Sequence, residues 1–323
     1  MKKRNLTLLF MIILLIAVAL IVLPGQRRKI PTVAEINAAI KAKGACWIAK
    51  ENKFTHWTFE ELKAMLGTFP EETAADEFEA PGKATGKPEK PPGKPEKPPK
   101  QPLPTSFDWS DNNGNWVTPV RDQGYCGSCW AFATVAQMES LIRIFYGNPF
   151  LDVDLSEQFI VSCDTSNHGC SGGRLQNVYQ FVQHTGTPDE DCFLYLATDE
   201  PCYSPLRCDD WANRVEKIKM WKWAVLRLDT NKLKKVVFEN GPVTCFMHVY
   251  YDLVFYESGC YEHVDAPWAG GHAVCIVGWT EEGCWIVKNS WGDDWGENGF
   301  FRIKFGNCKI GSQAGTFKYS GSR

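Results

Sequence analysis

Two cysteines, Cys126 and Cys129, are separated by two residues, and the second is followed at once by Trp130. Such a pair can be a redox-active dithiol, half of a zinc site, or one structural cysteine beside one reactive cysteine. The redox interpretation needs a thioredoxin-like strand–helix–strand context, and the zinc interpretation needs a second close pair; the sequence shows no clear sign of either. Cys129 stands where a helix is expected to begin, and the positive end of a helix favours a thiolate. This favours Cys129 as a nucleophile.

A nucleophilic cysteine needs a base that takes its proton, and the base needs a group that orients it. His272 lies 143 residues after Cys129, and Asn289 lies 17 residues further on. Taken alone, His272 would be more readily explained as a buried core residue and Asn289 as a turn residue. The combination with a reactive cysteine favours catalytic roles for both.

Five motifs occur in one order along the last two thirds of the chain. They are Gln123–Trp130, Leu155–Gln158, Cys163 with Cys170–Gly173, Gly270–Val274 and Val287–Gly299. In type, order and spacing they resemble the papain and cathepsin family of cysteine proteases over roughly residues 103–320. The resemblance implies a papain-like α+β fold of two lobes, one helical and one barrel-like, with the active-site cleft between them. It also implies hydrolysis of peptide bonds through an acyl-enzyme intermediate, without a metal or cofactor.

The resemblance assigns a role to each residue of the site. Cys129 is the nucleophile, and a neighbouring imidazolium should lower its pKa from ~8.5 towards ~4. His272 later protonates the leaving amine, and Asn289 orients the imidazole ring. Gln123 places its side-chain amide at the oxyanion, together with the backbone N–H of Cys129. Trp291 shields the Asn289–His272 bond and borders the substrate.

Residues of the substrate cleft follow from the same resemblance. Gly172 and Gly173 should bind substrate backbone, because the absence of Cβ permits a close approach. Gln313 falls where the family closes its second subsite. Gly271 stands where the family usually has Asn or Asp, which should loosen the local main chain. The sequence lacks the adjacent histidine pair of the cathepsin B occluding loop, so an endopeptidase is expected.

Thirteen cysteines are many for a reducing cytosol, and the odd number leaves at least one thiol without a partner in the chain. The resemblance implies four disulfides, the last of them the weakest inference: Cys126–Cys170, Cys163–Cys202, Cys192–Cys208 and Cys260–Cys308. The remaining cysteines of the catalytic region, Cys245, Cys275 and Cys284, are expected to be buried thiols, and the pairing of Cys46 stays open. The net charge of −3 and the pI of about 6.1 argue against binding to nucleic acid backbones. We expect a monomer.

Periodicity predicts helices in the first half of residues 103–323 and strands in the second half. The predicted helices are 130–146 and 175–185. The predicted strands are 243–249, 273–279, 285–288, 300–305 and 316–319. Helices that are segregated from strands indicate an α+β fold.

The residues before this catalytic domain (103–323) fall into three zones. Residues 1–29 carry an apolar run at 6–23 between basic residues, which predicts a signal peptide or an N-terminal membrane anchor and an exported protein. Residues 30–80 resemble the short prosegment of cathepsin B and contain two helical patterns, near 33–40 and 59–66. Residues 81–102 hold a repeated Gly-Lys-Pro-Glu-Lys-Pro-Pro unit, which predicts an extended linker. We expect a zymogen that is activated by cleavage between about Ala80 and Leu103.

Two other classes of function remain open at this stage. A papain-shaped protein without activity would commonly lack one of Cys129, His272, Asn289 or Gln123, and all four are present. A thiol oxidoreductase would use Cys126 and Cys129 as a reversible pair. Selective, rapid labelling of Cys129 by iodoacetamide at pH 5 would support the protease, whereas equal reactivity of both cysteines after mild reduction would support the oxidoreductase.

Overall fold

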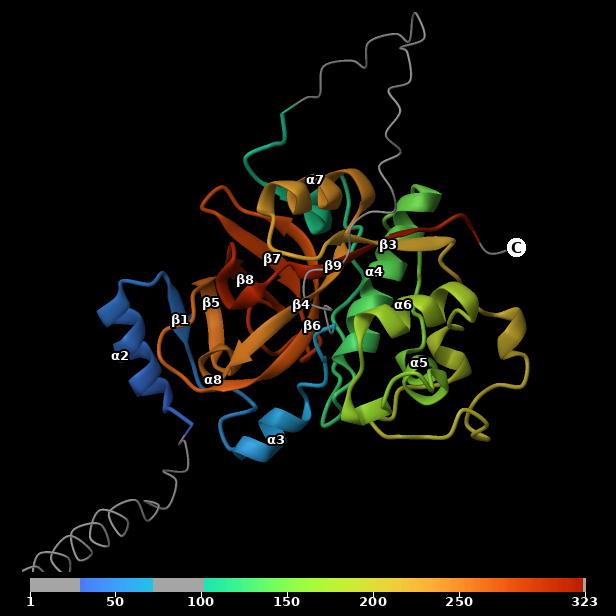
Figure 1. The fold of residues 1–323 in the computed structure, drawn as a ribbon, viewed down its shortest axis with the longest axis horizontal. Coiled ribbons are helices and arrows are strands. Elements are labelled where there is room, and N and C mark those ends of the chain that lie inside the picture. Colours follow the sequence, from blue (N-terminus) through green and yellow to red (C-terminus); the bar gives the residue numbers. More distant parts are fainter. Residues whose placement is uncertain (1–29, 72–101, 322–323) are drawn as a thin grey trace, which may run out of the picture.

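The computed structural model describes residues 30–71 and 102–321, and these form a molecule with two lobes and an added N-terminal segment (Figure 1). Helices gather in one lobe, drawn in green, and most strands gather in the other, drawn in orange and red. The predicted α+β fold is confirmed. We call residues 30–71 the N-terminal segment; it is drawn in blue and lies mainly against the strand lobe.

The helical lobe is built on α4 (Cys129–Tyr146), with α5 (Glu157–Cys163) and α6 (Leu175–His184) packed beside it. Nearly every residue of α4 from Cys129 to Ile142 is buried, so this helix forms the centre of the lobe. It ends at Gly147, whose φ of 62° gives the left-handed conformation that glycine adopts without strain. Both helices predicted from periodicity are confirmed, with ends that differ by one residue.

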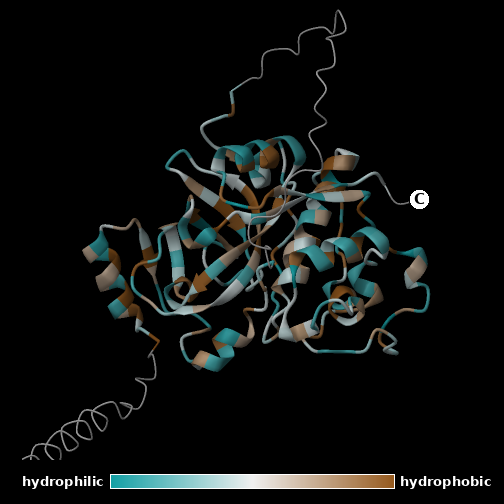
Figure 2. Cartoon of the chain, in the orientation of Figure 1, coloured by the Kyte–Doolittle hydropathy of each residue, from teal (hydrophilic) through white to brown (hydrophobic). Residues whose placement is uncertain are grey.

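The strand lobe is a mainly antiparallel sheet with the order β1-β5-β8-β7-β6-β4-β9-β3, and β2 also pairs with β6. The strands are β1 (Trp47–Ala49), β2 (Phe107–Asp108), β3 (Met220–Val225), β4 (Val243–Tyr250), β5 (Tyr256–Tyr261), β6 (Trp268–Trp279), β7 (Cys284–Lys288), β8 (Phe300–Lys304) and β9 (Ser312–Lys318). The helices α7 (Thr230–Asn240) and α8 (Tyr251–Val254) belong to the same part of the chain. All five predicted strands are present, whereas β3, β5 and α7 were not predicted. Figure 2 shows hydrophobic residues concentrated in the central strands and hydrophilic residues over much of α7.

The N-terminal segment comprises α2 (Val33–Lys43), β1 and α3 (Phe59–Ala64). Both helices begin with a capping box, at Thr32 with Glu35 and at Thr58 with Glu61, and both helical patterns expected near 33–40 and 59–66 are confirmed. Strand β1 pairs antiparallel with β5. Buried residues of the segment join the hydrophobic core of the strand lobe; they are Ile36, Ile40, Trp47, Ala49, Phe54, Leu62 and Met65. The segment therefore shares the core of the catalytic domain rather than building its own.

The disulfides agree with three expected pairs and correct the fourth. Cys126–Cys170, Cys163–Cys202 and Cys192–Cys208 are present. Cys260 is bonded to Cys284 and not to Cys308, so the expectations of a Cys260–Cys308 bridge and of a free Cys284 were wrong. The physical reason lies in the sheet: β5 pairs in parallel with β8, and β7 pairs with the other edge of β8. This arrangement brings the ends of β5 and β7 together. The order of the strands along the sequence does not reveal that β5 and β7 flank the same strand.

Among residues 30–71 and 102–321, no helix has the length and apolar character that a bilayer-spanning segment requires. The proposed membrane attachment through residues 6–23, the signal or anchor at 1–29 and nearly all of the linker at 81–102 lie outside the described residues.

Docking of the N-terminal segment gives a first prediction, which compares two isoleucines of that segment. Ile36 has no exposed surface, whereas Ile48 is 56% exposed. In the full-length Cys129→Ala chain, Ile36→Ala should lower the free energy of unfolding by about 2–5 kcal/mol, because it leaves a cavity in the shared core. Ile48→Ala should change it by less than about 0.5 kcal/mol. Urea unfolding followed by tryptophan fluorescence measures both, and equal losses would contradict the docking.

Candidate active site

Cys129 is the first residue of α4, and its side chain is completely buried. Ser128 precedes the helix but makes no side-chain hydrogen bond to the first turn. The N–H groups of that turn therefore keep their positive electrostatic character next to the sulfur. The Sγ atom of Cys129 lies 3.0 Å from Oγ1 of Thr68, a residue of the N-terminal segment. A hydroxyl group thus covers the sulfur.

His272 comes from β6 in the other lobe and is also fully buried. Its Nε2 atom lies 2.8 Å from Oδ1 of Asn289, which follows the end of β7. Because an amide oxygen only accepts, Nε2 carries a proton and Nδ1 is the nitrogen free to exchange a proton. No atom of the described residues lies in hydrogen-bond geometry to Nδ1. The ring of Trp291 lies 5.0 Å from the imidazole ring, and it is fully buried, so water has no access to the pair from that side.

The electrostatic balance at Cys129 places its pKa at about 7, below the ordinary value of a thiol. Burial raises the pKa, but the charge of His272 and its hydrogen-bonding interaction with the sulfur lower it more. The Thr68 hydroxyl and the backbone at Ala273 lower it further. The value lies above the ~4 expected from the sequence, because burial of the sulfur opposes the charged thiolate.

Gln123 is fully buried with its amide directed into the cleft. Its Nε2 atom donates to the backbone oxygens of Met65, at 2.8 Å, and of Cys126, at 2.7 Å. Its Oε1 atom accepts a hydrogen bond of 2.7 Å from the hydroxyl of Ser290. Ser290 therefore fixes which way the amide points, a positioning role that the sequence analysis missed. The signal was available, since Ser290 directly follows Asn289 in the last motif.

Residues 66–70 of the N-terminal segment cross the cleft without regular secondary structure, apart from an isolated bridge between Thr68 and Gly173. On the side of the helical lobe, the N–H of Gly173 donates to the oxygen of Gly67 at 2.7 Å, and that of Phe69 donates to the oxygen of Gly173 at 3.0 Å. On the side of the strand lobe, the N–H of Thr68 donates to the oxygen of Gly271 at 3.2 Å. Both lobes therefore hold this short segment by main-chain hydrogen bonds.

Two glycines permit this close approach. A Cβ on Gly172 would lie 2.2 Å from the oxygen of Gly67, and one on Gly271 would lie 2.1 Å from the oxygen of Thr68. Any side chain at either position would displace the segment in the cleft. The departure from Asn or Asp at Gly271 thus makes room for a backbone rather than only loosening the chain.

Gln313 lies at the edge of the cleft, where its Oε1 atom accepts a hydrogen bond of 3.1 Å from the backbone N–H of Glu71. A cavity of about 610 Å³ borders residues 66–70 and is lined in part by Phe69, Phe246, His248 and Trp268. The segment in the cleft thus borders this cavity along its length and contacts Gln313 at Glu71, directly after it.

The structure brings Cys129, His272, Asn289 and Gln123 together at the junction of the two lobes. It also places Gly172, Gly173, Trp291 and Gln313 around them, in contact with the ring of His272 or with the N-terminal segment. Of the other histidines, His248 lines the cleft cavity and His263 is hydrogen-bonded to Asp252. Within the described residues no group of His, Cys, Asp and Glu is arranged to hold a metal. A thiol with a lowered pKa, a buried imidazole and an amide donor are the groups that acyl transfer requires.

A family model described as papain family cysteine protease matches residues 103–317. The chain belongs to this family. It is therefore a peptide hydrolase that uses a cysteine. The match covers the two lobes and excludes the N-terminal segment.

Curated relatives and solved structures support the same assignment. The chain is 39% identical over 206 residues to "Cathepsin B-like CP3" of Giardia intestinalis, covering 62% of this chain and 69% of the relative. It is 35% identical to "Pro-cathepsin H" of Mus musculus, over 66% of this chain and 64% of the relative. Digestive procathepsin L2 of Tenebrio molitor matches with a TM-score of 0.66 and 28% identity, over 88% of each chain. "proCathepsin B S9" of Trypanosoma congolense shares the fold, with a TM-score of 0.74 and 23% identity, over 90% of this chain and 99% of that one.

The balance at Cys129 gives a prediction on its ionisation. In the full-length chain, the thiolate ultraviolet absorbance that Cys129→Ser removes should appear with a midpoint near pH 7. His272→Ala should move the midpoint to higher pH, because burial then acts against a much weaker stabilisation of the thiolate. Thr68→Val should raise it by a smaller amount, because it removes one hydrogen bond only. An unchanged midpoint in His272→Ala would contradict the pairing.

Proposed function

We propose that this protein is the zymogen of a cysteine endopeptidase, in which Cys129 is the nucleophile and the N-terminal segment is the inhibitor. One observation carries the proposal: residues 65–69 occupy the groups that a substrate would need. The Thr68 hydroxyl contacts the sulfur of Cys129, and the Met65 carbonyl accepts the hydrogen bond of the Gln123 amide.

In the released enzyme, the Cys129 thiolate attacks the carbonyl carbon of a substrate peptide bond and forms an S–C bond. The negative charge that develops on the carbonyl oxygen is stabilised by the Gln123 amide, at the position that Met65 occupies in the zymogen. The His272 imidazolium then gives its Nδ1 proton to the leaving amine as the C–N bond breaks. A water molecule, deprotonated by His272, attacks the thioester, releases the acid and regenerates the thiolate.

Asn289 and Trp291 act through His272. The hydrogen bond between Nε2 and the Asn289 oxygen keeps the ring in the orientation that points Nδ1 towards the sulfur. Trp291 packs against the ring and excludes water from this bond, which makes the bond stronger. Both residues are positioning residues for the proton transfers.

The N-terminal segment inhibits because it fills the cleft and places the Thr68 hydroxyl next to the sulfur. The backbone oxygens of Met65 and Gly67 are held by Gln123 and Gly173, respectively, and the atom next to the sulfur is a hydroxyl oxygen. A hydroxyl oxygen cannot accept the attack of a thiolate. The segment can therefore bind as a substrate does and remain uncut at Thr68.

The thiol oxidoreductase alternative loses its physical basis in this structure. Cys126 is bonded to Cys170, with the two Cα atoms 4.6 Å apart, and Cys129 is a free thiol. The two cysteines of the motif thus have separate roles. Four disulfides favour an exported or lysosomal protein. We include in the same proposal that the catalytic domain is released from the anchor or signal at residues 1–29 and from the linker.

Inhibition by the N-terminal segment predicts a large difference in activity on cleavage. The full-length chain should hydrolyse peptides roughly 10²-fold or more slowly than the same chain cut between Ala80 and Leu103 and freed of its N-terminal fragment, because an attached inhibitor acts at a high effective concentration. Initial rates on a peptide library measure this. The cut Cys129→Ala chain, which should be inactive, is the control. Equal rates before and after cutting would refute autoinhibition.

The oxyanion role of Gln123 predicts a defect in turnover. In the activated enzyme, Gln123→Ala should lower kcat about 10²- to 10³-fold and leave KM nearly unchanged, since the amide stabilises charge that develops only in the transition state. Gln180→Ala, an exposed glutamine on α6, is the matched control. If the two variants have the same kcat, Gln123 does not serve the oxyanion.

Acidic pH should weaken the docking of the N-terminal segment through Glu262. Hydrogen bonds and charge from Lys304 and Lys43 lower the pKa of this carboxyl group, so its contribution is present at neutral pH and is lost as the pH falls through the lowered pKa. In the Cys129→Ala chain, Glu262→Gln should increase hydrogen exchange of β1 at pH 7 by roughly two- to fivefold. It should also reduce the pH dependence below pH 5. Glu239→Gln, whose partner Lys235 is on the same helix, should change neither.

A further inference from the structure

Cys46 is the exposed thiol of the N-terminal segment. Eight of the thirteen cysteines form the four disulfides, and five are free. Of these five, Cys129 is the nucleophile, Cys245 and Cys275 are buried, and Cys308 is partly buried and donates to Oδ1 of Asn307 at 3.0 Å. Cys46 alone is exposed. A free exposed thiol in a disulfide-rich protein is a reactive group whose surroundings decide what it meets.

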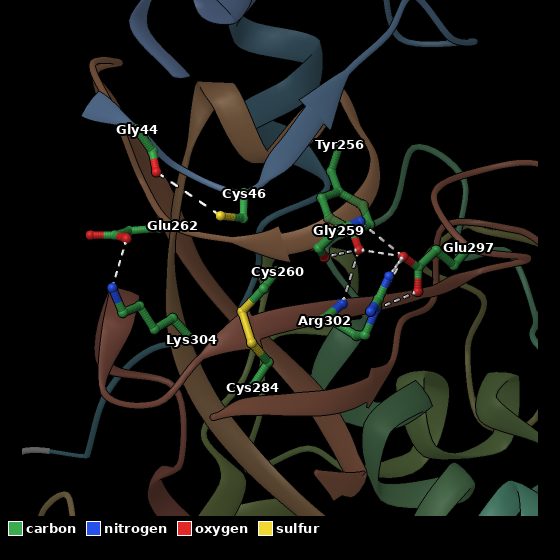
Figure 3. Close-up of a disulfide and its surroundings, with 10 residues drawn as sticks. All are labelled: Gly44, Cys46, Tyr256, Gly259, Cys260, Glu262, Cys284, Glu297, Arg302 and Lys304. Carbon is green, nitrogen blue, oxygen red and sulfur yellow. Dashed lines mark hydrogen bonds and ion pairs between the residues drawn. A yellow bond between two sulfur atoms is a disulfide. The ribbon is translucent and has the colours of Figure 1, made fainter. Parts of the chain in front are cut away.

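Strand pairing places Cys46 opposite the Cys260–Cys284 disulfide (Figure 3). In the β1–β5 pair, Trp47 is the partner of Gly259, so the next pair in this antiparallel register is Cys46 with Cys260. The N–H of Cys260 donates to the backbone oxygen of Cys46 at 3.0 Å, which confirms the contact. Residues directly opposite each other in an antiparallel pair direct their side chains to the same face of the sheet.

The spacing of such a pair suits a disulfide. Hydrogen-bonded partners in antiparallel strands have Cα atoms about 5.5 Å apart, and disulfides form at Cα separations of about 4.4–6.8 Å. The present partner of Cys260 is Cys284, at a Cα separation of 6.1 Å, on a strand that is not its neighbour in the sheet. Cys260 is therefore bonded to Cys284 and faces Cys46 of the N-terminal segment in the β1–β5 register. The Cys46 sulfur lies 4.0 Å from the Gly44 oxygen and must rotate about its side-chain bond to reach Cys260.

Ion pairs hold β1 in this register on both sides of Cys46. Lys43 pairs with Glu262 at 3.1 Å, and Lys50 pairs with Glu257 at 2.9 Å. Pairing of β1 with β5, to which these ion pairs add, keeps the thiol next to the disulfide, so attack within the molecule occurs at an effective concentration that a small thiol in solution does not match.

We propose that Cys46 is a site of thiol–disulfide exchange, through which the N-terminal segment becomes covalently joined to the catalytic domain at Cys260. The Cys46 thiolate attacks Sγ of Cys260, the Cys46–Cys260 bond forms, and the Cys260–Cys284 bond breaks. Cys284 leaves as a thiolate and takes up the proton that Cys46 released, so the step needs no oxidant.

The link would give activation a second requirement, a consequence that rests on the proposed inhibitory function of the segment. Cleavage of the linker separates the segment from residue 103 onward only when no other covalent bond joins the two. With the Cys46–Cys260 bond in place, the cut segment stays in the cleft until a thiol reductant breaks that bond. Release of the enzyme then needs both a proteolytic cut and a reducing partner.

Disulfide mapping of the full-length Cys129→Ala chain tests the exchange. The protein is equilibrated in a glutathione buffer of varied thiol-to-disulfide ratio, its free thiols are alkylated at low pH, and the digested peptides are identified without reduction. We expect a Cys46–Cys260 peptide in at least about a tenth of the chains. Cys46→Ser should abolish it, and Cys308→Ser, which changes a free cysteine off the exchange route, should leave its yield unchanged. In Cys284→Ser, with glutathione disulfide as the oxidant, it should become the main product.

The opposite results are equally clear. If Cys46 is alkylated in every buffer and Cys260 is found only with Cys284, the exchange does not occur. If Cys260 of the Cys284→Ser chain carries glutathione while Cys46 stays alkylated, the two sulfurs do not reach each other, and the proposal is wrong. Mapping needs no proteolytic activity, so its outcome is separate from the rates that test autoinhibition.

Discussion

The structure depends on keeping one thiol and one imidazole together in a place without water. Cys129 and His272 come from different lobes and are both fully buried, and burial by itself opposes the charged pair. The charge of His272 outweighs this penalty, with the result that the pKa of Cys129 lies at about 7. Three groups next to the pair contribute to this balance of charge and burial. They are the N-terminal end of α4, the Asn289 oxygen and the Trp291 ring. The two lobes must therefore keep a fixed relative position for the thiol and the imidazole to exchange a proton.

The same junction explains how the protein is controlled. A cleft that binds an extended backbone between two glycine-containing edges accepts a substrate and an inhibitor by the same hydrogen bonds. What separates the two is the atom that meets the sulfur. In the zymogen this atom is the Thr68 hydroxyl oxygen, which offers no electrophilic carbon. The inhibitor is thus held by the binding apparatus of the enzyme and escapes its reaction.

The N-terminal segment docks through several exposed ion pairs, which are weak, and through burial of its apolar side chains, which is strong. Its ion pairs are largely exposed, and such pairs contribute little individually. Its buried residues extend the hydrophobic core of the strand lobe, and β1 adds an edge strand to the sheet. Apolar burial thus provides most of the stability, whereas the proposed responses to pH and to redox conditions involve the exposed pairs and Cys46. Control and stability reside in different atoms of the same segment.

Sequence motifs were sufficient for the family, the α+β class and three disulfides, and they named the residues that the structure gathers at the junction of the lobes. This worked because a short motif such as Cys126–Trp130 or Val287–Gly299 encodes local chemistry and local backbone geometry. The capping box at Thr58 and the helices at 130–146 and 175–185 were predictable for the same reason, since their signals lie within a few residues.

Contacts between residues far apart in the sequence decided the fourth disulfide, the role of Ser290 and the pKa of Cys129. The partner of Cys260 follows from the order β5-β8-β7, which links residues far apart in the chain and leaves no local signature. Ser290 gained its role only when the fold placed Gln123 against it, 167 residues away in sequence. The pKa of Cys129 differs from the expected value because the folded protein buries the sulfur completely. By itself the sequence determined which chemical groups are present, and the tertiary structure decided which of them meet and how much water they retain.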